Sequence, residues 1–325
     1  MKPKILITRA VFPDVIQRLE NFFEVDSNPS DKIYSEAELI EKCRDKDGVF
    51  ANPADRISAN LMQACPQLKA VCNMAVGYNN IDVAAATKAG IKVTNTPDVL
   101  NQTTADFAWA LLMATARRVT ESEHFLRAGK WEKWTYDGFL GADVYGSTLG
   151  IIGMGRIGQA IARRSMGFDM KVVYHNRSQL TPEQEAYANH AQYKTRDQVL
   201  QEADHIILVL PYSPAVHHYI GAAEIALMKP TATLVNIARG GIVDDAALIA
   251  ALKHGQIAAA GLDVFENEPA FNQEFLSCTN VVLTPHIASA SEPTRRAMAN
   301  CAADNLIAAL SGQTPPNWLN PESAQ

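Results

Sequence analysis

The sequence has no apolar run long enough to span a membrane, and its first residues lack the long apolar segment of a signal peptide. Positive charge is not in excess either, since 29 Lys and Arg stand against 35 Asp and Glu, with a net charge of −6. This balance argues against a protein that binds nucleic acid or a membrane surface. We therefore expect a cytoplasmic protein with no nucleic-acid or membrane partner.

Cysteine is scarce and unpaired in the sequence. The five cysteines are odd in number and scattered, which is typical of reduced thiols rather than of a disulfide framework. No cluster of His, Cys and carboxylate residues has the spacing of metal ligands, so we expect no metal site. With 325 residues, of which 47% are hydrophobic and 20% charged, the chain has room for two globular domains.

A glycine-rich stretch follows a short apolar run, Leu149–Ile152. Gly153, Gly155 and Gly158 come next, and a helical spacing of apolar residues continues to Ala162. Strand, tight turn and helix in this order are typical of dinucleotide binding, where the glycines allow the turn, the approach of a pyrophosphate, and close packing of the helix. A plain glycine-rich connector is the alternative.

The next apolar run, Lys171–Tyr174, is not followed by an acidic residue. An Asp or Glu at this strand end is typical of NAD binding, and a basic residue is typical of NADP binding. Here Asn176 is uncharged, Arg177 offers a planar fork for a 2′-phosphate, and Ser178 adds a hydroxyl. A solvated arginine is the alternative, but the sequence favours NADP(H), with NAD(H) possible.

The first hundred residues alternate strand-like and helix-like segments, which predicts a parallel α/β unit. No dinucleotide glycine pattern occurs among them. The strand-like runs are Ile5–Thr8, Gly48–Ala51, Ala70–Asn73 and Ile91–Thr94, and the helix-like runs are Asp14–Phe23, Ser35–Arg44, Ser58–Ala64 and Asp82–Ala89. The loop Met74–Asn80 is either a plain turn or a place where backbone N–H groups meet a small anion.

A long buried helix is predicted over Thr103–Arg118, where apolar residues and alanines follow a helical spacing. Residues 121–146 then read as an irregular segment rich in aromatic residues, among them Trp131 and Trp134. Aromatic residues on such a connection favour packing against a neighbouring domain or subunit. We expect a dimer contact here.

Three later strand ends bring together residues that do not belong in a core. Arg239 follows the run Thr233–Ile237, Glu268 follows the segment that begins at Ala258, and His286 follows Val281. Ligands of open α/β sheets bind beyond the carboxyl ends of strands. Alone, Arg239 reads as a surface ion-pair partner and His286 as a structural histidine.

Together these three side chains suit the reduction of a carbonyl group. Hydride delivery to a ketone leaves charge on oxygen, which a histidine can protonate. Glu268 would favour the imidazolium form and orient it, and Arg239 would bind a substrate carboxylate or the oxo oxygen. The adjacent His217 and His218 read as solvated loop residues.

Several motifs carry a resemblance to a known family. They are Leu-Gly-Ile-Ile-Gly-Met-Gly-Arg-Ile-Gly, Asn-Ile-Ala-Arg-Gly-Gly-Ile-Val-Asp, Gly-Leu-Asp-Val-Phe-Glu-Asn-Glu-Pro and Leu-Thr-Pro-His-Ile-Ala-Ser-Ala. With these the whole chain resembles the D-isomer-specific 2-hydroxyacid dehydrogenases, and most of all the glyoxylate/hydroxypyruvate reductases. The resemblance implies reduction of small 2-oxo acids to D-2-hydroxy acids by hydride transfer from NADPH.

The resemblance also implies a fold. It predicts two Rossmann-like or flavodoxin-like parallel-sheet lobes with the active site in the cleft between them. Residues 1–98 with 289–325 would form the substrate domain, and residues 99–288 the dinucleotide-binding domain. A homodimer built through the cofactor domain is implied as well, with the segment near Trp131 and Trp134 reaching toward the partner's active site.

Site residues follow from the matching motif positions. Arg239 resembles the substrate-binding arginine, His286 the general acid/base and Glu268 its partner. Val76 and Gly77 match the loop whose backbone amides hold the substrate carboxylate. Cofactor contacts are implied at Thr104, Arg156, Ile157, Pro211, Ile237 and Asp263, with Asp263 placed for the nicotinamide carboxamide.

Other activities occur on the same fold. Phosphite-oxidising relatives have a lysine where this chain reads Ala75-Val76-Gly77, and formate dehydrogenases pair their histidine with Gln rather than Glu. Reductases of 2-ketogluconate or bulkier 2-oxo acids stay open as alternatives. A nucleotide-sensing corepressor is a further alternative, although this chain ends at Gln325 without the long disordered tail of such proteins.

Overall fold

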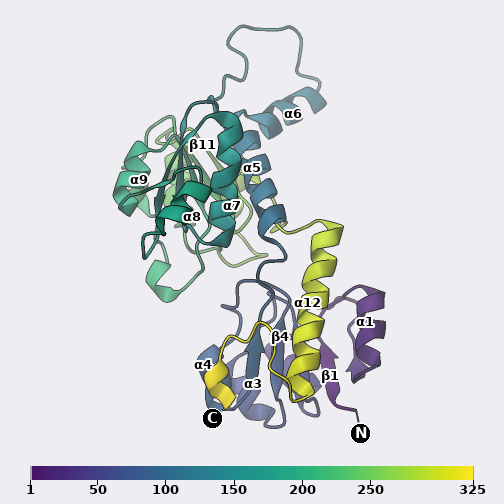
Figure 1. The fold of residues 1–325 in the computed structure, drawn as a ribbon. Helices are drawn as coiled ribbons and strands as arrows, with labels where there is room; N and C mark the ends of the chain where they lie inside the picture. The colour runs from purple at the N-terminus through teal and green to yellow at the C-terminus, as the bar shows by residue number, and fades with distance from the viewer. Residues whose placement is uncertain (1, 325) are drawn as a thin grey trace. The chain divides into compact units, whose positions relative to one another are not determined.

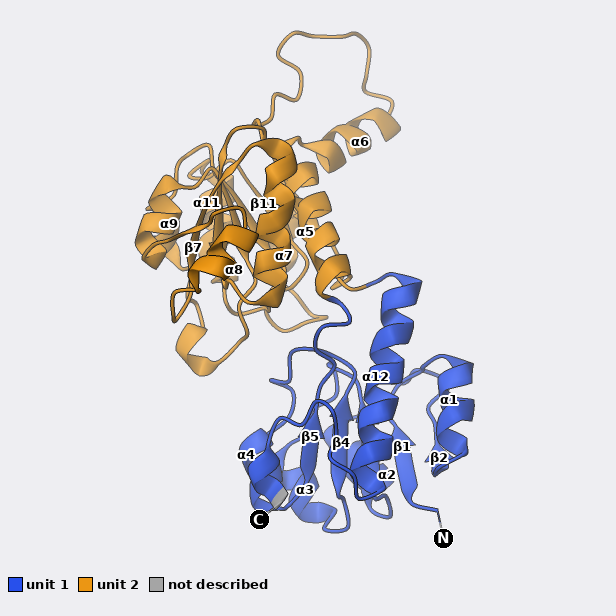
Figure 2. Cartoon of the chain, viewed as in Figure 1, with its two compact units in different colours: residues 1–100, 290–325 blue, residues 101–289 orange. Residues whose placement is uncertain are grey.

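The computed structural model describes residues 2–324, which form two compact units (Figure 2). The five-strand unit comprises residues 1–100 and 290–325, and the seven-strand unit comprises residues 101–289. The sequence predicts domain boundaries at 98/99 and 288/289. Each unit has its own parallel sheet and hydrophobic core, so the prediction of two parallel-sheet lobes is confirmed.

The five-strand unit has a sheet in the order β2-β1-β3-β4-β5. Its strands are β1 (Lys4–Ile7), β2 (Glu24–Asp26), β3 (Gly48–Ala51), β4 (Ala70–Asn73) and β5 (Lys92–Thr94), and every pair is parallel. All residues of β3 and β4 are buried, as expected where helices cover both faces of a parallel sheet. The order is flavodoxin-like, and such sheets bind ligands beyond the carboxyl ends of their strands.

Helices pack on both faces of this sheet (Figure 1). They are α1 (Pro13–Glu20), α2 (Glu36–Cys43), α3 (Ala59–Ala64), α4 (Val83–Lys88), α12 (Glu292–Leu310) and the short 3-10 helix η4 (Pro321–Ala324). The start of α2 follows from its sequence, because Ser35 and Glu38 form a reciprocal capping box. The 19-residue α12 packs along β3, β4 and β5 and brings the end of the chain into this unit.

The seven-strand unit is also fully parallel, in the order β12-β11-β10-β9-β6-β7-β8. Its strands are β6 (Thr148–Ile152), β7 (Lys171–His175), β8 (Gln192–Tyr193), β9 (His205–Leu208), β10 (Thr233–Asn236), β11 (Ala259–Leu262) and β12 (Val281–Leu283). The chain builds outward from β6 in one direction and from β9 in the other. The order therefore reverses between β6 and β9, which is the switch point where doubly wound sheets bind dinucleotides.

Helices cover both faces of the second sheet as well. They are α5 (Asn101–Ala116), α6 (Val119–Arg127), α7 (Arg156–Arg164), α8 (Pro182–Tyr187), α9 (Arg196–Glu202), α10 (Ala222–Ile225) and α11 (Asp245–Lys253), with 3-10 turns η1 (Ser165–Phe168), η2 (Pro214–Val216) and η3 (Gln273–Ser277). The buried α5 packs against α7 and β11. A Cβ on Gly261 would lie 2.4 Å from the Thr115 hydroxyl, so this close approach of helix to strand requires glycine.

Two edge strands and one helix were not anticipated. β2 and β8 are short and contain no buried residue, so they lack the apolar run that marks an interior strand. α6 occupies residues that the sequence analysis read as irregular from residue 121 onward. It has no buried residue, and it is separated from α5 by Arg118, whose φ of 53° ends the first helix.

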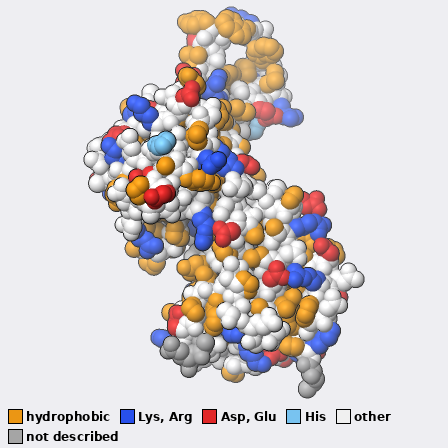
Figure 3. All heavy atoms as spheres, viewed as in Figure 1, with side chains coloured by type: hydrophobic (Ala, Val, Ile, Leu, Met, Phe, Trp, Pro, Cys, Tyr) orange, Lys and Arg blue, Asp and Glu red, His pale blue; other side chains and the backbone are white. Residues whose placement is uncertain are grey.

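An aromatic arm, residues 128–146, follows α6 and returns to β6 (Figure 1). Trp131, Trp134 and Tyr136 are 63%, 79% and 82% exposed, and Figure 3 shows hydrophobic side chains gathered on this segment. Such exposure of large aromatic residues is unusual on a surface that only faces water. The arm is the largest exposed aromatic feature of the seven-strand unit.

The structure also gives findings on membrane-spanning helices, metal sites and cysteines. Within residues 2–324, none of the helices combines the length and the hydropathy that crossing a membrane requires. The same residues hold no group of three or more His, Cys, Asp or Glu side chains placed to bind a metal ion. All five cysteines are free thiols.

Candidate active site

The glycine loop between β6 and α7 has the geometry that a pyrophosphate needs. Gly153 has a φ of 105°, and a Cβ there would lie 2.7 Å from the backbone N of Leu210. A Cβ on Gly158 would lie 2.3 Å from the carbonyl oxygen of Gly153, whereas a Cβ on Gly155 would meet nothing within 4 Å. Two glycines thus allow close packing, and the third leaves open space where an anion can approach the backbone.

The first turn of α7 adds electrostatic attraction for an anion. The helix begins at Arg156 with Gly155 as its N-cap, and no described side chain caps it. Its first N–H groups and the positive end of its dipole are therefore available to a negatively charged group. Arg156 is exposed and Ile157 is partly buried against the core. The chain's residues here fit a dinucleotide cofactor.

The loop after β7 is held in place by two tyrosines. The buried Tyr174 accepts a hydrogen bond from the N–H of Leu180 at 2.8 Å, and Tyr193 donates to the carbonyl of Asn176 at 3.2 Å. Arg177 and Ser178 are exposed at the tip of this fixed loop. The structure thus presents a guanidinium and a hydroxyl directly beyond β7, where the sequence has no carboxylate.

Glu268 and His286 form the central contact of the candidate site. Nδ1 of His286 lies 2.8 Å from Oε2 of Glu268, while Oε1 of Glu268 accepts the N–H of Phe265 at 2.8 Å. Burial alone would raise the pKa of Glu268, but the bond and charge of His286, the Phe265 N–H and the Arg239 charge outweigh it and lower that pKa. Glu268 is therefore a carboxylate with the histidine as its main partner.

Arg239 lies in the turn after β10, close enough to Glu268 for their charges to interact. One guanidinium nitrogen of Arg239 donates to the carbonyl of Ala238 at 2.7 Å, and this hydrogen bond orients the guanidinium group. Burial lowers the pKa of Arg239, and the Glu268 carboxylate opposes that effect. The structure thus brings Arg239, Glu268 and His286 together within the seven-strand unit.

Asp263 fixes the backbone around His286. Its side chain is fully buried and accepts hydrogen bonds from the N–H groups of Ile287 and Ala288, at 2.8 and 2.9 Å, and from the hydroxyl of Thr284 at 2.8 Å. His286 itself has a φ of 55°, a region that non-glycine residues seldom adopt. Such a conformation persists only where surrounding contacts stabilise it, and the hydrogen bonds that Asp263 accepts from Ile287 and Ala288 are such contacts.

The remaining predicted cofactor residues also lie in the seven-strand unit. Thr104 is buried in the second turn of α5, which packs against α7. Pro211 is exposed three residues before η2 begins, and Ile237 is buried directly after β10. Pro211 and Ile237 thus follow the carboxyl ends of neighbouring strands.

The loop that is predicted to bind the substrate carboxylate lies in the five-strand unit, after β4. The side-chain amide of Asn73 donates to the carbonyl of Gly77 at 2.8 Å, and that of Asn95 donates to the carbonyl of Val76 at 2.8 Å. Within residues 2–324, the N–H groups of Val76 and Gly77 donate to no other group. Two amide side chains therefore hold the carbonyls while the N–H groups stay available to an anion.

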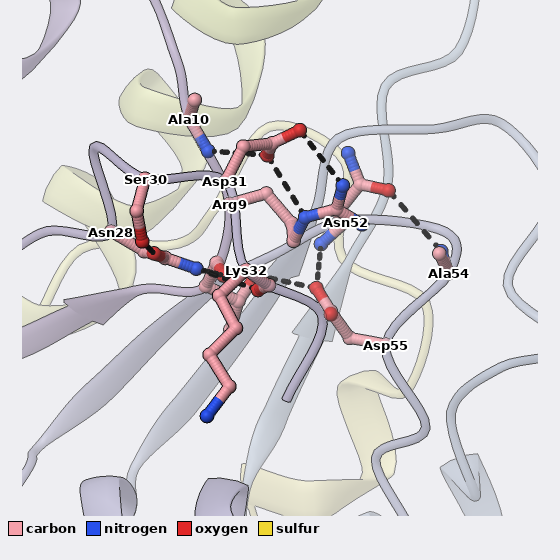
Figure 4. A network of polar contacts seen from close by, with 10 residues as sticks. Arg9, Ala10, Asn28, Ser30, Asp31, Lys32, Asn52, Ala54 and Asp55 are labelled. Atoms are coloured by element: carbon pink, nitrogen blue, oxygen red, sulfur yellow. Dashed lines mark hydrogen bonds and ion pairs between the residues drawn. The ribbon is translucent and has the colours of Figure 1, made fainter. Parts of the chain in front are cut away.

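This loop rests on a polar network at the same edge of the sheet (Figure 4). Asn80 donates to the carbonyl of Asp55 at 3.0 Å, and the Asp55 carboxylate accepts the N–H of Asn52 at 2.8 Å. Arg9 forms two 2.9 Å hydrogen bonds with Asp31 beside it. The network joins the loops after β1, β2 and β3, and Asn80 connects it to the loop that contains Val76 and Gly77.

Sequence reasoning missed one contact beside the site. His218 is exposed, as predicted for a solvated loop residue, but its Nε2 also lies 2.6 Å from Oε1 of Glu266, two residues before Glu268. No local sequence pattern predicts the contact between His218 and Glu266, because the two residues lie 48 positions apart. The sequence indicates only that both residues follow strands of the same predicted sheet.

Comparisons with known proteins place the chain in a family. Residues 109–288 match the family described as D-isomer specific 2-hydroxyacid dehydrogenase, NAD binding domain. A glyoxylate reductase of Thermococcus gammatolerans is 49% identical, over 99% of this chain and 97% of that protein.

Solved structures are similar over the whole chain. The NADPH-dependent glyoxylate/hydroxypyruvate reductase of Sinorhizobium meliloti, in complex with NADP and malonate, has a TM-score of 0.89 and 36% identity, covering 100% of this chain and 98% of that one. A glyoxylate reductase from Paecilomyes thermophila has a TM-score of 0.88 and 32% identity, covering 99% of each chain. With the glycine loop and the three strand-end residues in place, the chain belongs to the D-isomer specific 2-hydroxyacid dehydrogenase family.

Proposed function

We propose that this protein reduces glyoxylate, hydroxypyruvate and related small 2-oxo acids to D-2-hydroxy acids, using NADPH. The observation that carries the proposal is the pairing of His286 with Glu268 beside Arg239. The 49% identity to a glyoxylate reductase over nearly the full length supports the choice of substrate.

The three side chains would divide the work on the substrate. Reduction of a ketone places negative charge on its oxygen, and His286 donates the proton that neutralises it. Because Nδ1 of His286 faces Glu268, Nε2 is the atom that reaches the substrate. Arg239 binds the carboxylate or the oxo oxygen through charge-assisted hydrogen bonds. The bound nicotinamide cofactor supplies the hydride.

Binding of the substrate carboxylate is proposed for the turn at Val76 and Gly77. Its N–H groups are unengaged among the described residues, and its carbonyls are tied back by Asn73 and Asn95. Two N–H groups presented together bind a carboxylate without a charged side chain.

Cofactor binding is proposed at the glycine loop and at the residues that surround it in the sheet. These are Thr104, Gly153, Gly155, Arg156, Ile157, Gly158, Asn176, Arg177, Ser178, Pro211, Ile237 and Asp263. Preference for NADPH over NADH is proposed from Arg177 and Ser178, which stand exposed where NAD-dependent enzymes have an acid. The similar Sinorhizobium enzyme is named as NADPH-dependent and was solved with NADP.

A homodimer is proposed through the aromatic arm. The seven-strand unit has a cavity of about 590 Å³ at the amino ends of β9 to β12, beside the base of the arm. His205, Thr233 and Val281 are among its lining residues. We propose that the arm of a second copy covers this surface, since reciprocal exchange would bury the tryptophans of both arms.

The cytoplasm remains the proposed location. Five free cysteines, of which all but Cys301 are buried, are compatible with a reducing compartment.

The proposal is tested by a panel of 2-oxo acids, assayed by the oxidation of NADPH and, separately, of NADH. We expect turnover of glyoxylate and hydroxypyruvate, faster with NADPH, and slower turnover of 2-ketogluconate and aromatic 2-oxo acids. His286→Ala should abolish most turnover while NADPH still binds. Binding of NADPH with no turnover of any 2-oxo acid would instead indicate a nucleotide sensor.

A further inference from the structure

His218 lies in a cluster of charged groups that the proposed chemistry does not use. Its Nε2 is 2.6 Å from Oε1 of Glu266, and its Nδ1 is 3.8 Å from Oδ2 of Asp244. Its ring stacks on that of His217 with centroids 4.0 Å apart. The side chain is 39% exposed, so this is a fixed but solvent-accessible contact.

The backbone of His218 is tied to the turn that carries Arg239. The N–H of His218 donates to the carbonyl of Gly241 at 2.7 Å, two residues beyond Arg239. Two positions later, the N–H of Ile220 donates to the carbonyl of Ile242 at 3.0 Å. The segment after β9 therefore runs alongside the turn after β10.

The turn after β10 also packs directly against the loop after β11. A Cβ on Gly240 would come within 1.6 Å of the carbonyl oxygen of Phe265, so no side chain fits between the two. Phe265 and Glu268 belong to one turn, closed by the 2.8 Å bond from the Phe265 N–H to the Glu268 carboxylate. A shift of Glu266 would thus move the partner of His286.

Backbone strain is concentrated where these loops meet. His218 has a φ of 51°, Gly241 of 77° and Asn267 of 58°. For His218 and Asn267 this left-handed conformation costs free energy, and it persists only where surrounding contacts hold it. The side-chain bond between His218 and Glu266 joins one strained residue to the residue directly before the other.

Acidic side chains gather around His218. They are Asp244 and Asp245 at the start of α11 and Glu266 in the loop after β11, while the ring of His217 stacks on that of His218. Burial, with help from Glu266 and Asp244, raises the pKa of Asp245 to about 6, which reflects this crowding of negative charge.

Neither a metal site nor a simple surface ion pair accounts for the arrangement. Within the described part of the chain, no group of three or more His, Cys, Asp or Glu side chains is placed to hold a metal ion. An exposed ion pair adds little to stability, about 0 to 1 kcal/mol, which does not explain why the backbone of His218 is held in a left-handed conformation.

We propose that His218 is a positioning residue, which acts through Glu266 to hold the turn of Arg239 and the turn of Glu268 in fixed relation to each other. The inference rests on the proposed function, because Arg239 and Glu268 act on the substrate only if the protein reduces 2-oxo acids. Loss of the contact would let Arg239 and the His286–Glu268 pair drift apart.

Four variants test this inference on the full-length protein with NADPH and glyoxylate. His218→Ala removes the contact, His218→Gln places an amide N–H near the position of Nε2, and Glu266→Ala removes the partner. His254→Ala is the matched control, since His254 at the end of α11 bonds only to its own helix among the described residues.

We expect His218→Ala to lower kcat/KM for glyoxylate by about tenfold or more, mostly through a higher KM, because Arg239 loses its alignment. The dissociation constant of NADPH, measured by fluorescence, should change by less than about twofold, since the glycine loop is untouched. His218→Gln should recover most of the loss, and His254→Ala should match the wild type.

A double-mutant cycle completes the test. Because the two residues act as one unit, His218→Ala with Glu266→Ala should lose no more than either single variant. Additive losses, an unchanged kcat/KM in His218→Ala, or a Gln variant as impaired as the Ala variant would each overturn the inference.

Two further outcomes keep the test decisive. If His218→Ala does not fold, Glu266→Ala decides alone, and a wild-type kcat/KM in the folded variant overturns the inference. A wild-type protein without turnover would refute the proposed function itself, whereas an active wild type with unaffected variants refutes only the role of His218.

Discussion

Oε2 of Glu268 lies 2.8 Å from Nδ1 of His286, and the two residues come from loops that follow β11 and β12. The carboxylate thus occupies one side of the imidazole and leaves Nε2 for a substrate. His286 has a left-handed backbone that Asp263 holds through the two residues after it. The orientation of the ring is therefore fixed by its side-chain partner and by its backbone.

Glu268→Gln should change the pH profile of turnover. The amide keeps a hydrogen-bond acceptor for Nδ1 of His286 but has no negative charge, and it has no carboxyl group to protonate. Burial would raise the pKa of Glu268, but the bond and charge of His286 outweigh it and lower that pKa, so the wild type should lose activity only when the pH falls below the ordinary range of a glutamate. We expect kcat of the variant for glyoxylate to be about tenfold lower near neutral pH and to lack this loss at acidic pH.

Steady-state rates across a pH series provide the measurement for Glu268→Gln. NADPH binding serves as the control and should be unaffected. A profile that coincides with that of the wild type would show that the charge of Glu268 does not act on His286.

Arg177→Ala should change the choice of cofactor. The guanidinium is exposed beyond β7, where it would pair with the 2′-phosphate of NADPH, a group that NADH lacks. We expect KM for NADPH to rise by about tenfold or more, with KM for NADH nearly unchanged. Equal losses for the two cofactors would contradict the phosphate assignment. Arg163→Ala, on the helix α7 and also cationic, is the control for a general loss of positive charge.

Asp245→Asn should stabilise the protein at alkaline pH. Burial, followed by the charges of Glu266 and Asp244, raises the pKa of Asp245 to about 6 from an ordinary value of 3.8. The folded protein therefore holds a proton that the unfolded chain releases, and this contribution to stability is complete below pH 3.8 and lost as the pH rises through about 6.

Above that range the wild type carries a buried, repelled carboxylate that the amide lacks. We expect the variant to be more stable by about 1 kcal/mol at pH 8, after allowance for solvent screening and the helix dipole, with the difference shrinking toward pH 5. Urea denaturation at several pH values measures it. A variant that is less stable at every pH would refute the assigned repulsion.

The double variant Trp131→Ser and Trp134→Ser should weaken self-association. Both side chains are more than half exposed on the aromatic arm, and their burial against a second copy would contribute several kcal/mol to a dimer. Sedimentation velocity should show a dimeric wild type and a larger monomer fraction in the variant. Phe22→Ser, an exposed aromatic in the five-strand unit, is the matched control. A monomeric wild type would rule out the proposed dimer.

Much of the fold follows from local patterns in the sequence. Gly153, Gly155 and Gly158 stand directly after a buried strand, and their spacing predicts both the turn and the start of α7. Arg239 and His286 each follow an apolar run, and parallel strands bring their carboxyl ends to one edge of a sheet. Local pattern and the rules of parallel sheets therefore suffice for these residues.

Other parts could not be predicted, for identifiable reasons. β8 has only exposed residues and α6 has no buried ones, so neither leaves an apolar pattern. The contacts of Asp263 with Ile287 and Ala288, and of His218 with Glu266, join loops far apart in sequence. Such pairs depend on the register of whole strands, which a local pattern does not contain.

We propose that Arg239, Glu268 and His286 serve the reduction of one oxo group by NADPH. This role is tested by reducing hydroxypyruvate with NADPH that carries deuterium at the transferable hydride position, followed by mass spectrometry and chiral separation of the product. We expect equal amounts of NADP and D-glycerate, with one deuterium on the carbon that bore the oxo group. L-glycerate, a product without deuterium, or no product at all would contradict it.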